Sequence, residues 1–275
     1  MMLEQLAKNL GMLKQEFVKI YEGHSHIQEL IPSNSSEFFP INESHLELLH
    51  SFVAKNPIYH NSYEKKIGDT NCIVYEGDIN EYWLNSIKHG SSCQPFYPTW
   101  VISAYVAVSF AKKFGYKELI DIGSGDGRIA FCAKILELKS TSIEIDDALV
   151  ELQNTILSAT SINFNPICVD AIEYDYFTLD LTRPVFFIGG LPQMGGDILA
   201  KNIIEKISAT DLKKNTCIVF AGTHSKRQLS GNQSMGGWSS LIDIHGLKVI
   251  ETVSLPTIWT FDQQDDTPYI YTEFT

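Results

Sequence analysis

A glycine-rich stretch near the middle of the chain constrains its fold more than any other feature. Residues 119–122 form an apolar run that contains Asp121, glycines follow at Gly123, Gly125 and Gly127, and a helix-forming segment comes next. This order predicts a buried strand, a tight turn and a helix. Glycines allow positive φ angles and a close approach of a ligand to the backbone, and the first turn of a helix carries N–H groups that have no partner within the helix. We therefore expect a ligand site at this turn.

The residues on both sides of this turn alternate between apolar runs and helix-like segments. We expect strands at 118–122, 141–145, 167–169, 184–188, 217–221, 247–252 and 269–273, with helices at about 127–138, 147–158 and 196–208 between them. Such alternation predicts an α/β fold with a doubly wound, mostly parallel sheet. Since no helix separates the last two strands, one edge is expected to be antiparallel. The prediction for residues 94–275 is a seven-stranded, Rossmann-like sheet.

Residues 1–93 show no chemical motif and are predicted to form a mainly helical region. An apolar stripe marks the first helix, at Leu3, Leu6, Leu10, Leu13, Phe17 and Ile20. This stripe fits a coiled coil that joins two copies of the chain, or a helix that packs on its own chain; its short length favours packing. We expect a connector at 23–40, a second helix from Asn42, a loop at 56–70 and a short strand at 72–75.

The composition excludes several classes of function. Acidic residues outnumber basic ones by 33 to 21, which gives a formal net charge of -12. This charge disfavours a DNA-binding surface and an anionic-membrane surface, so neither partner is expected. The five cysteines form no CxxC pair, and His24 and His26 lack further nearby ligands, so we predict no metal site. The N-terminus has no basic segment followed by an apolar one, which favours a cytoplasmic protein.

Three kinds of ligand compete for the glycine turn: a nucleoside triphosphate, a dinucleotide and S-adenosylmethionine. A phosphate-binding P-loop requires Gly-Lys-Ser/Thr, whereas this chain has Arg128 and Ile129 after Gly127. The dinucleotide fingerprint requires a glycine at the sixth position counted from Gly123, and that position is again Arg128. Its side chain would obstruct close packing of helix on strand. The sequence therefore disfavours the first two ligands.

The segment from Asp121 to Gly127 resembles the first motif of the class I S-adenosylmethionine-dependent methyltransferases. Glu144, 21 positions after Gly123, matches the acid at the end of the second strand, and Asp170 follows the third strand. An acid at the end of the neighbouring strand is where a ribose diol is held. The resemblance implies a methyltransferase whose cofactor, S-adenosylmethionine, is bound by Asp121, Gly123, Ser124, Gly125, Gly127, Glu144 and Asp170.

A second resemblance concerns the segment before the glycine turn. Tyr97, Pro98 and Thr99 are similar to a motif of archaeal protein lysine methyltransferases and non-SET histone lysine methyltransferases. The similarity implies that Tyr97 and Thr99 close the site over the methionine end of the cofactor, and it favours a protein lysine as acceptor. The other interpretation is that Pro98 and Thr99 begin a helix and Tyr97 packs against it.

The loop after the fourth strand departs from the pattern of amino-methylating relatives. Gly189 and Gly190 begin this loop, and the Asp/Asn-Pro-Pro-Tyr/Phe box of base N-methyltransferases is missing. Gly189 is expected to approach the ligand closely or to give the loop freedom. His224, after the fifth strand, has a suitable intrinsic pKa for a general base. His224 and Tyr97 are the predicted catalytic residues. An RNA or small-molecule acceptor, or a cofactor-binding module without transfer activity, stays open.

Overall fold

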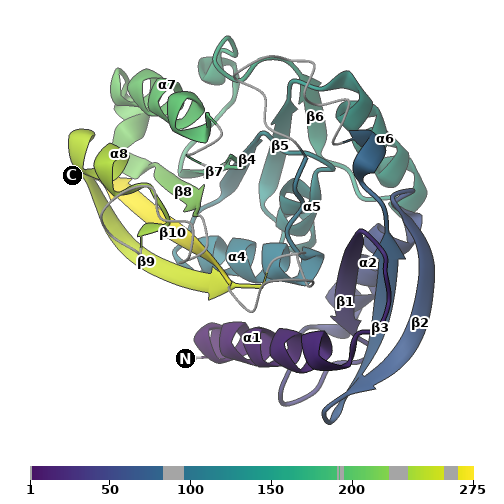
Figure 1. Cartoon of the computed structure of the whole chain (residues 1–275). Coiled ribbons are helices and arrows are strands. Elements are labelled where there is room, and N and C mark those ends of the chain that lie inside the picture. Colours follow the sequence, from purple (N-terminus) through teal and green to yellow (C-terminus); the bar gives the residue numbers. More distant parts are fainter. Residues whose placement is uncertain (1, 83–95, 191, 193–194, 223–234, 257–265) are drawn as a thin grey trace.

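The computed structural model describes residues 2–82, 96–190, 192, 195–222, 235–256 and 266–275 (Figure 1). Its larger sheet has seven strands in the order β6-β5-β4-β7-β8-β10-β9. The strands are β4 (Glu118–Ile122), β5 (Lys139–Glu144), β6 (Asn165–Cys168), β7 (Pro184–Ile188), β8 (Cys217–Ala221), β9 (Leu247–Leu255) and β10 (Thr267–Phe274). All pairs from β6 to β8 are parallel, and β10 runs antiparallel to both β8 and β9. The predicted seven-stranded sheet with an antiparallel edge is confirmed.

Helices cover both faces of this sheet. They are α4 (Val101–Lys113), α5 (Arg128–Ile135), α6 (Asp147–Thr160), α7 (Gly196–Ser208) and α8 (Ser239–Ile244). Successive strand residues enter two different hydrophobic clusters: Leu119 belongs to the cluster that contains α4 and α5, and Ile120 to the cluster that contains α7 and α8. A sheet buried on both faces produces continuous apolar runs, which is why the sequence marked these strands well. No helix within the described ranges is long and apolar enough to cross a membrane.

Residues 2–82 contain a second sheet besides two helices. The region contains α1 (Met2–Ile20), β1 (Ile27–Pro32), α2 (Glu43–Lys55), β2 (Tyr59–Ile67) and β3 (Thr70–Gly77), and the strands form an antiparallel sheet in the order β1-β3-β2. The predicted connector and loop were therefore wrong, while the short strand is part of β3. Strand β1 is buried throughout, including Gln28 and Glu29, so it lacks alternation; β2 is an exposed polar edge strand that reads as a loop.

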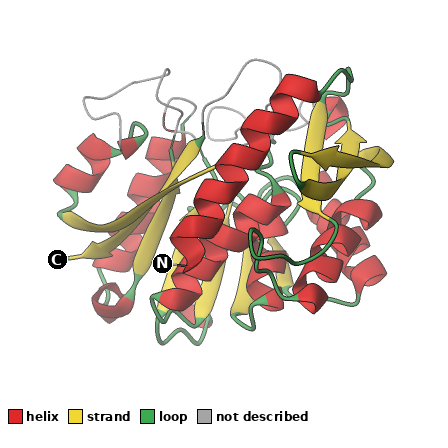
Figure 2. Cartoon of the chain, turned by 90° about the horizontal axis from the view of Figure 1, so that it is seen from below, coloured by secondary structure: helices red, strands yellow, loops and turns green. Residues whose placement is uncertain are grey.

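Helix α1 packs on its own chain. Leu6, Leu10, Leu13 and Phe17 are buried, and α1 contacts α4 and β9. Figure 2 shows α1 lying diagonally across the face of the larger sheet. The packing interpretation is confirmed, and the buried stripe offers no seam for a coiled coil.

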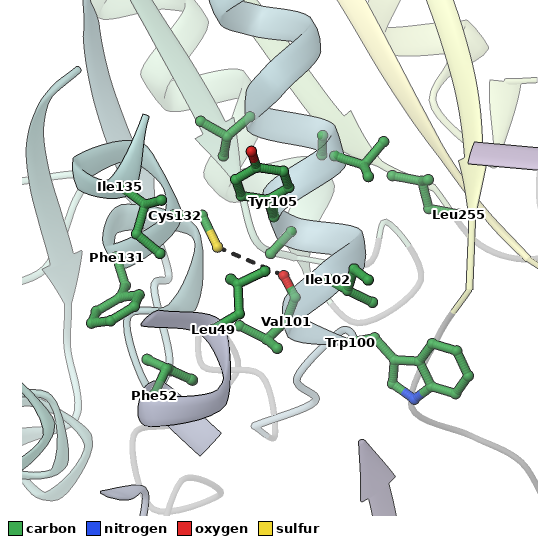
Figure 3. Close-up of a cluster of buried hydrophobic side chains, with 14 of the residues drawn as sticks. Leu49, Phe52, Trp100, Val101, Ile102, Tyr105, Phe131, Cys132, Ile135 and Leu255 are labelled. Atoms are coloured by element: carbon green, nitrogen blue, oxygen red, sulfur yellow. Dashed lines mark hydrogen bonds between the residues drawn. The ribbon is translucent and has the colours of Figure 1, made fainter. Parts of the chain in front are cut away.

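The N-terminal region and the larger sheet share one hydrophobic core. Figure 3 shows Leu49 and Phe52 of α2 beside Val101 of α4 and the residues Phe131 and Cys132 of α5. The rings of Phe52 and Phe131 lie 4.8 Å apart, and the Cys132 thiol donates to the carbonyl oxygen of Val101 at 3.6 Å. The boundary predicted at residue 93 therefore does not separate two cores.

Candidate functional site

The glycine turn lies at the carboxyl end of β4 and is held by the end of β5. Gly123, Gly125 and Gly127 have φ angles of 65°, 57° and 78°, a left-handed region that side chains disfavour. The N–H of Gly123 donates to the carbonyl oxygen of Ile143 in β5 at 2.9 Å. The turn is therefore fixed by backbone geometry that the three glycines make possible, as the sequence predicted.

Gly189 approaches the turn itself. Its N–H donates to the carbonyl oxygen of Ile122 at 2.7 Å, and a Cβ atom at this position would lie 2.5 Å from the carbonyl oxygen of Gly123. The missing side chain thus allows the ends of β4 and β7 to lie side by side. The structure explains this glycine by a contact between two backbones; its contact with a ligand stays a prediction.

Glu144 ends β5 and binds the turn. Its Oε2 accepts from the N–H of Gly125 at 2.8 Å, and its Oε1 accepts from the N–H groups of Ile145 at 2.8 Å and Asp146 at 3.1 Å. Burial raises the pKa of the Glu144 carboxyl, and these hydrogen bonds oppose that shift. The carboxylate is therefore positioned beside the glycines by three backbone donors.

Asp170 follows the next strand along the same edge. The N–H of Val169 donates to the carbonyl oxygen of Glu144 at 2.9 Å, which places Asp170 one residue beyond that contact. Its side chain is partly exposed, and its Oδ1 accepts from the N–H of Ile172 at 2.9 Å. The turn, Glu144 and Asp170 thus lie at the carboxyl ends of the adjacent strands β4, β5 and β6.

Asp121 lies within β4 and is directed at helix α5. Only 2% of Asp121 is exposed, and its Oδ2 accepts from the N–H of Ala130 at 3.2 Å. Burial, reinforced by the charges of Glu144 and Asp126, raises the pKa of Asp121 to about 8. The described contact of this carboxyl is with the helix that follows the turn, and its predicted contact with a cofactor stays untested.

Ser124 is held by a glutamine that the sequence did not single out. Gln153 of α6 is fully buried, and its Nε2 donates to the Ser124 hydroxyl at 2.9 Å and to the carbonyl oxygen of Gly125 at 2.7 Å. Its Oε1 accepts from the Ser142 hydroxyl at 2.5 Å. Because all polar atoms of the Gln153 side chain are used within this corner, it braces the turn from below.

The segment before α4 lies against the turn through Phe96. A Cβ atom on Gly125 would lie 2.6 Å from the Phe96 ring, whereas Tyr97 is 36% exposed. The Thr99 hydroxyl donates to the carbonyl oxygen of Pro256 at 3.4 Å. Helix α4 begins at Val101, so Pro98 precedes the helix and the alternative interpretation of this proline as a helix start is wrong. The segment contacts the turn through Phe96, and the roles of Tyr97 and Thr99 toward the cofactor remain predictions.

The predicted general base His224 lies outside the described residues. The catalytic assignment of His224 therefore stays a prediction. Most of the loop that follows Gly189 and Gly190 also lies outside the described residues.

The chain's own carboxyl groups occupy N–H groups of the turn and of the helix start. The N–H of Gly125 donates to Glu144, that of Ala130 to Asp121, and that of Arg128 to Asp126 at 3.4 Å. A phosphate bound at a helix N-terminus needs such donors and a positive potential. Here it would meet donors that the chain's own carboxyl groups already occupy. The arrangement fits an uncharged or cationic ligand that offers hydroxyl and amine donors.

No family model matches this sequence, and no curated protein matches it. Among solved structures, the chain is similar to the Pyrococcus abyssi tRNA (uracil-54, C5)-methyltransferase in complex with S-adenosyl-L-homocysteine, at 10% identity and a TM-score of 0.47, over 78% of this chain and 44% of that one. It is also similar to the ribosomal protein L11 methylase from Lactobacillus delbrueckii subsp. bulgaricus, at 14% identity and a TM-score of 0.42, over 63% and 78% of the two chains.

A further similar structure is MtNAS in complex with MTA and tNA, at 14% identity and a TM-score of 0.44 over 62% of this chain. The match spans 60% of the length of MtNAS. At such identities and TM-scores these likenesses assign no ligand, so any assignment has to rest on the residues of this chain. By its strand order and its glycine turn, the protein has the seven-stranded, Rossmann-like fold that its sequence predicts.

Proposed function

We propose that this protein binds S-adenosylmethionine at the glycine turn and transfers its methyl group to an acceptor. One observation carries the proposal: the turn, Glu144 and Asp170 lie in that order at the ends of three adjacent strands. A carboxylate offers about four lone-pair sites, and the described backbone donors to Glu144 number three, so it can still accept from a ribose hydroxyl. Asp170, one strand further, is our candidate to accept from the adenine amino group.

The electrostatics of the site support the same cofactor. S-adenosylmethionine carries no phosphate and has a positive sulfonium, which suits a turn whose donors already bind carboxylates. When bound, it would supply a methyl group: an acceptor lone pair would attack the methyl carbon in line, the carbon–sulfur bond would break, and S-adenosylhomocysteine would leave. Such a reaction depends mainly on positioning two reactants, which well-ordered sites achieve with large gains in rate. The braced turn and Glu144 would supply this positioning on the cofactor side.

A protein lysine is the acceptor that we favour. The net charge of -12 attracts a basic protein at long range, and the Tyr97 segment resembles that of lysine methyltransferases. A lysine ammonium has to lose a proton before it can attack, so this acceptor requires a base. His224 is our candidate for that base.

Calorimetry with S-adenosylmethionine and S-adenosylhomocysteine tests the cofactor. Binding is expected, and Glu144→Gln should weaken it about tenfold or more, because a charge-assisted hydrogen bond is lost. Asp146→Asn is the matched control. Asp146 caps α6 through the N–H groups of Ala148 and Leu149, and asparagine caps equally well, so its affinity should equal that of the wild type. Absence of binding by the wild type would refute the cofactor assignment.

Tritium-labelled cofactor and a native lysate test the acceptor. The label should resist nuclease, be released by protease and appear as methyl-lysine after hydrolysis. Label in nucleic acid or in a small molecule would leave methyl transfer standing and overturn the lysine acceptor. Tight binding without any label would favour a module that binds the cofactor without transferring a methyl group.

A further inference from the structure

A buried ionic cluster joins the N-terminal region to the glycine turn. We call it the Arg128 cluster, and its members are Glu29, Asn56, Tyr59, Asp126 and Arg128. The side chains of Glu29, Asp126 and Arg128 are 0%, 1% and 3% exposed. Asp126 and Arg128 belong to the turn and to the first residue of α5, whereas the other three members come from β1, β2 and the end of α2.

On the side of the turn, Arg128 binds Asp126 with two nitrogens. Its Nε donates to Oδ1 at 2.9 Å, and its Nη2 donates to Oδ2 at 2.5 Å. Asn56 also donates from Nδ2 to Oδ2 of Asp126 at 2.9 Å. Two parallel bonds fix the plane of the guanidinium as well as its position. The side chain of Arg128 is therefore rigidly connected to Gly125 and Gly127, the residues on either side of Asp126.

On the other side, Arg128 Nη1 donates to Glu29 Oε1 and to the carbonyl oxygen of Thr99. Glu29 in turn accepts from the Tyr59 hydroxyl at 2.9 Å and, through Oε2, from the N–H of Val101 at 2.8 Å. Val101 is the first residue of α4, directly after the segment that packs on Gly125. Glu29 thus links the start of α4 to the start of α5, on both sides of the turn.

Burying the charged groups of this cluster carries a desolvation cost that apolar side chains would not have. Burial raises the pKa of Glu29, and the Arg128 guanidinium opposes that shift. Buried ion pairs generally contribute little net stability compared with apolar residues of similar volume, and their best-supported benefit is a defined arrangement. The guanidinium also lies 5.7 Å from the centre of the ring of Phe52, a residue of the shared hydrophobic core. What apolar side chains would lose is the fixed distance between the two helix starts.

We infer that Glu29 is a positioning residue for the cofactor: acting through Arg128, it holds the glycine turn and the Phe96–Thr99 segment in register. The inference rests on the proposed function. It assigns to residues 1–93, which carry no cofactor motif, control over cofactor affinity. Small displacements of a binding group are costly in affinity, so an unbraced Arg128 should weaken binding even while the fold persists.

The test compares Glu29→Gln with Glu118→Gln at a temperature well below both melting points. Glu118 is a buried carboxylate at the opposite end of β4, where it accepts from the Thr182 hydroxyl at 2.8 Å and the N–H of Arg183 at 2.9 Å. Both variants should lower the melting temperature. Only Glu29→Gln should weaken binding of S-adenosylhomocysteine, by about tenfold, and raise the KM for the cofactor while kcat changes little.

Equal affinity of Glu29→Gln and the wild type, with a lowered melting temperature, would overturn the inference and leave the proposed function intact. If the wild type binds neither cofactor nor product, both fail. Should Glu29→Gln not fold, Tyr59→Phe makes a related comparison, because it removes one hydroxyl that donates to Glu29 and accepts from Arg128 Nη2 at 3.3 Å. We expect Tyr59→Phe to weaken binding about threefold, and unchanged affinity would again overturn the inference.

Discussion

The carboxyl of Asp121 makes stability depend on pH in an unusual direction for an acid. Its folded pKa of about 8 lies above the ordinary value, so the folded protein binds this proton more tightly than the unfolded chain does. The stabilising contribution is fully present below the unfolded pKa, near 4, and is lost as pH rises toward 8. This single group should cost roughly 1 kcal/mol for each pH unit in that window.

Asp121→Asn should remove this dependence, because asparagine keeps an acceptor for the N–H of Ala130 and does not ionise in this range. Urea unfolding of both proteins between pH 5 and 8 measures the effect. The stability of the wild type should fall relative to that of the variant as pH rises. Parallel curves would show that the carboxyl is not protonated in the folded state.

The residues of the turn were predictable from sequence because the turn is local. Gly123, Gly125 and Gly127 serve a conformation that the chain needs within five residues, and Glu144 follows at the spacing of one strand–helix–strand unit. Glu29 gave no such signal, since it meets Arg128 across 99 positions. The contact of Phe96 with Gly125 could not be predicted either, because an aromatic residue in a connector does not reveal which glycine it covers.

At the scale of elements, the approach of β7 to β4 gives a test of the site's construction. Gly189→Ala would push a methyl group against the carbonyl oxygen of Gly123, a backbone atom that can move only with the turn. We expect a loss of about 1–3 kcal/mol in the free energy of unfolding, together with weaker cofactor binding. Denaturant unfolding and calorimetry measure the two effects.

Gly68→Ala is the matched control for that substitution. Gly68 has a φ angle of 55° in the hairpin between β2 and β3, with nothing within 4 Å of its added Cβ atom. Backbone strain there should cost about 1 kcal/mol and leave cofactor affinity unchanged. If Gly189→Ala binds the cofactor as well as Gly68→Ala does, the close contact of the two strand ends does not shape the site.

The strands of the larger sheet were predictable as elements, and those of the smaller sheet only in part. Strand β7 is an apolar run buried at all five positions, so its composition alone identifies it. Strand β2 carries polar side chains at an exposed edge, and its extended form comes from pairing with β3 rather than from its own residues. Pairing partners distant in the chain are what a single sequence shows least.

For the molecule as a whole, the shared core decides how the N-terminal region is to be regarded. Leu10 and Phe17 of α1, Leu49 of α2 and Phe131 of α5 belong to the same buried cluster. Together with the Arg128 cluster, this packing makes residues 2–82 part of the structure that holds the turn. An appended substrate-binding module would instead be expected to keep a core of its own.

Three buried thiols allow the opening of this shared core to be measured as a rate of alkylation. Cys72 lies in the small sheet, Cys132 in α5 and Cys217 in β8. All three are buried, and burial raises the pKa of each thiol. Each can react with an alkylating reagent only when its surroundings open. If the chain unfolds as one cooperative unit, the three thiols should be labelled at a common rate. Peptide mass spectrometry measures the rate at each cysteine. Faster labelling of Cys72 would show that the small sheet opens first, so that the molecule has two opening rates instead of one.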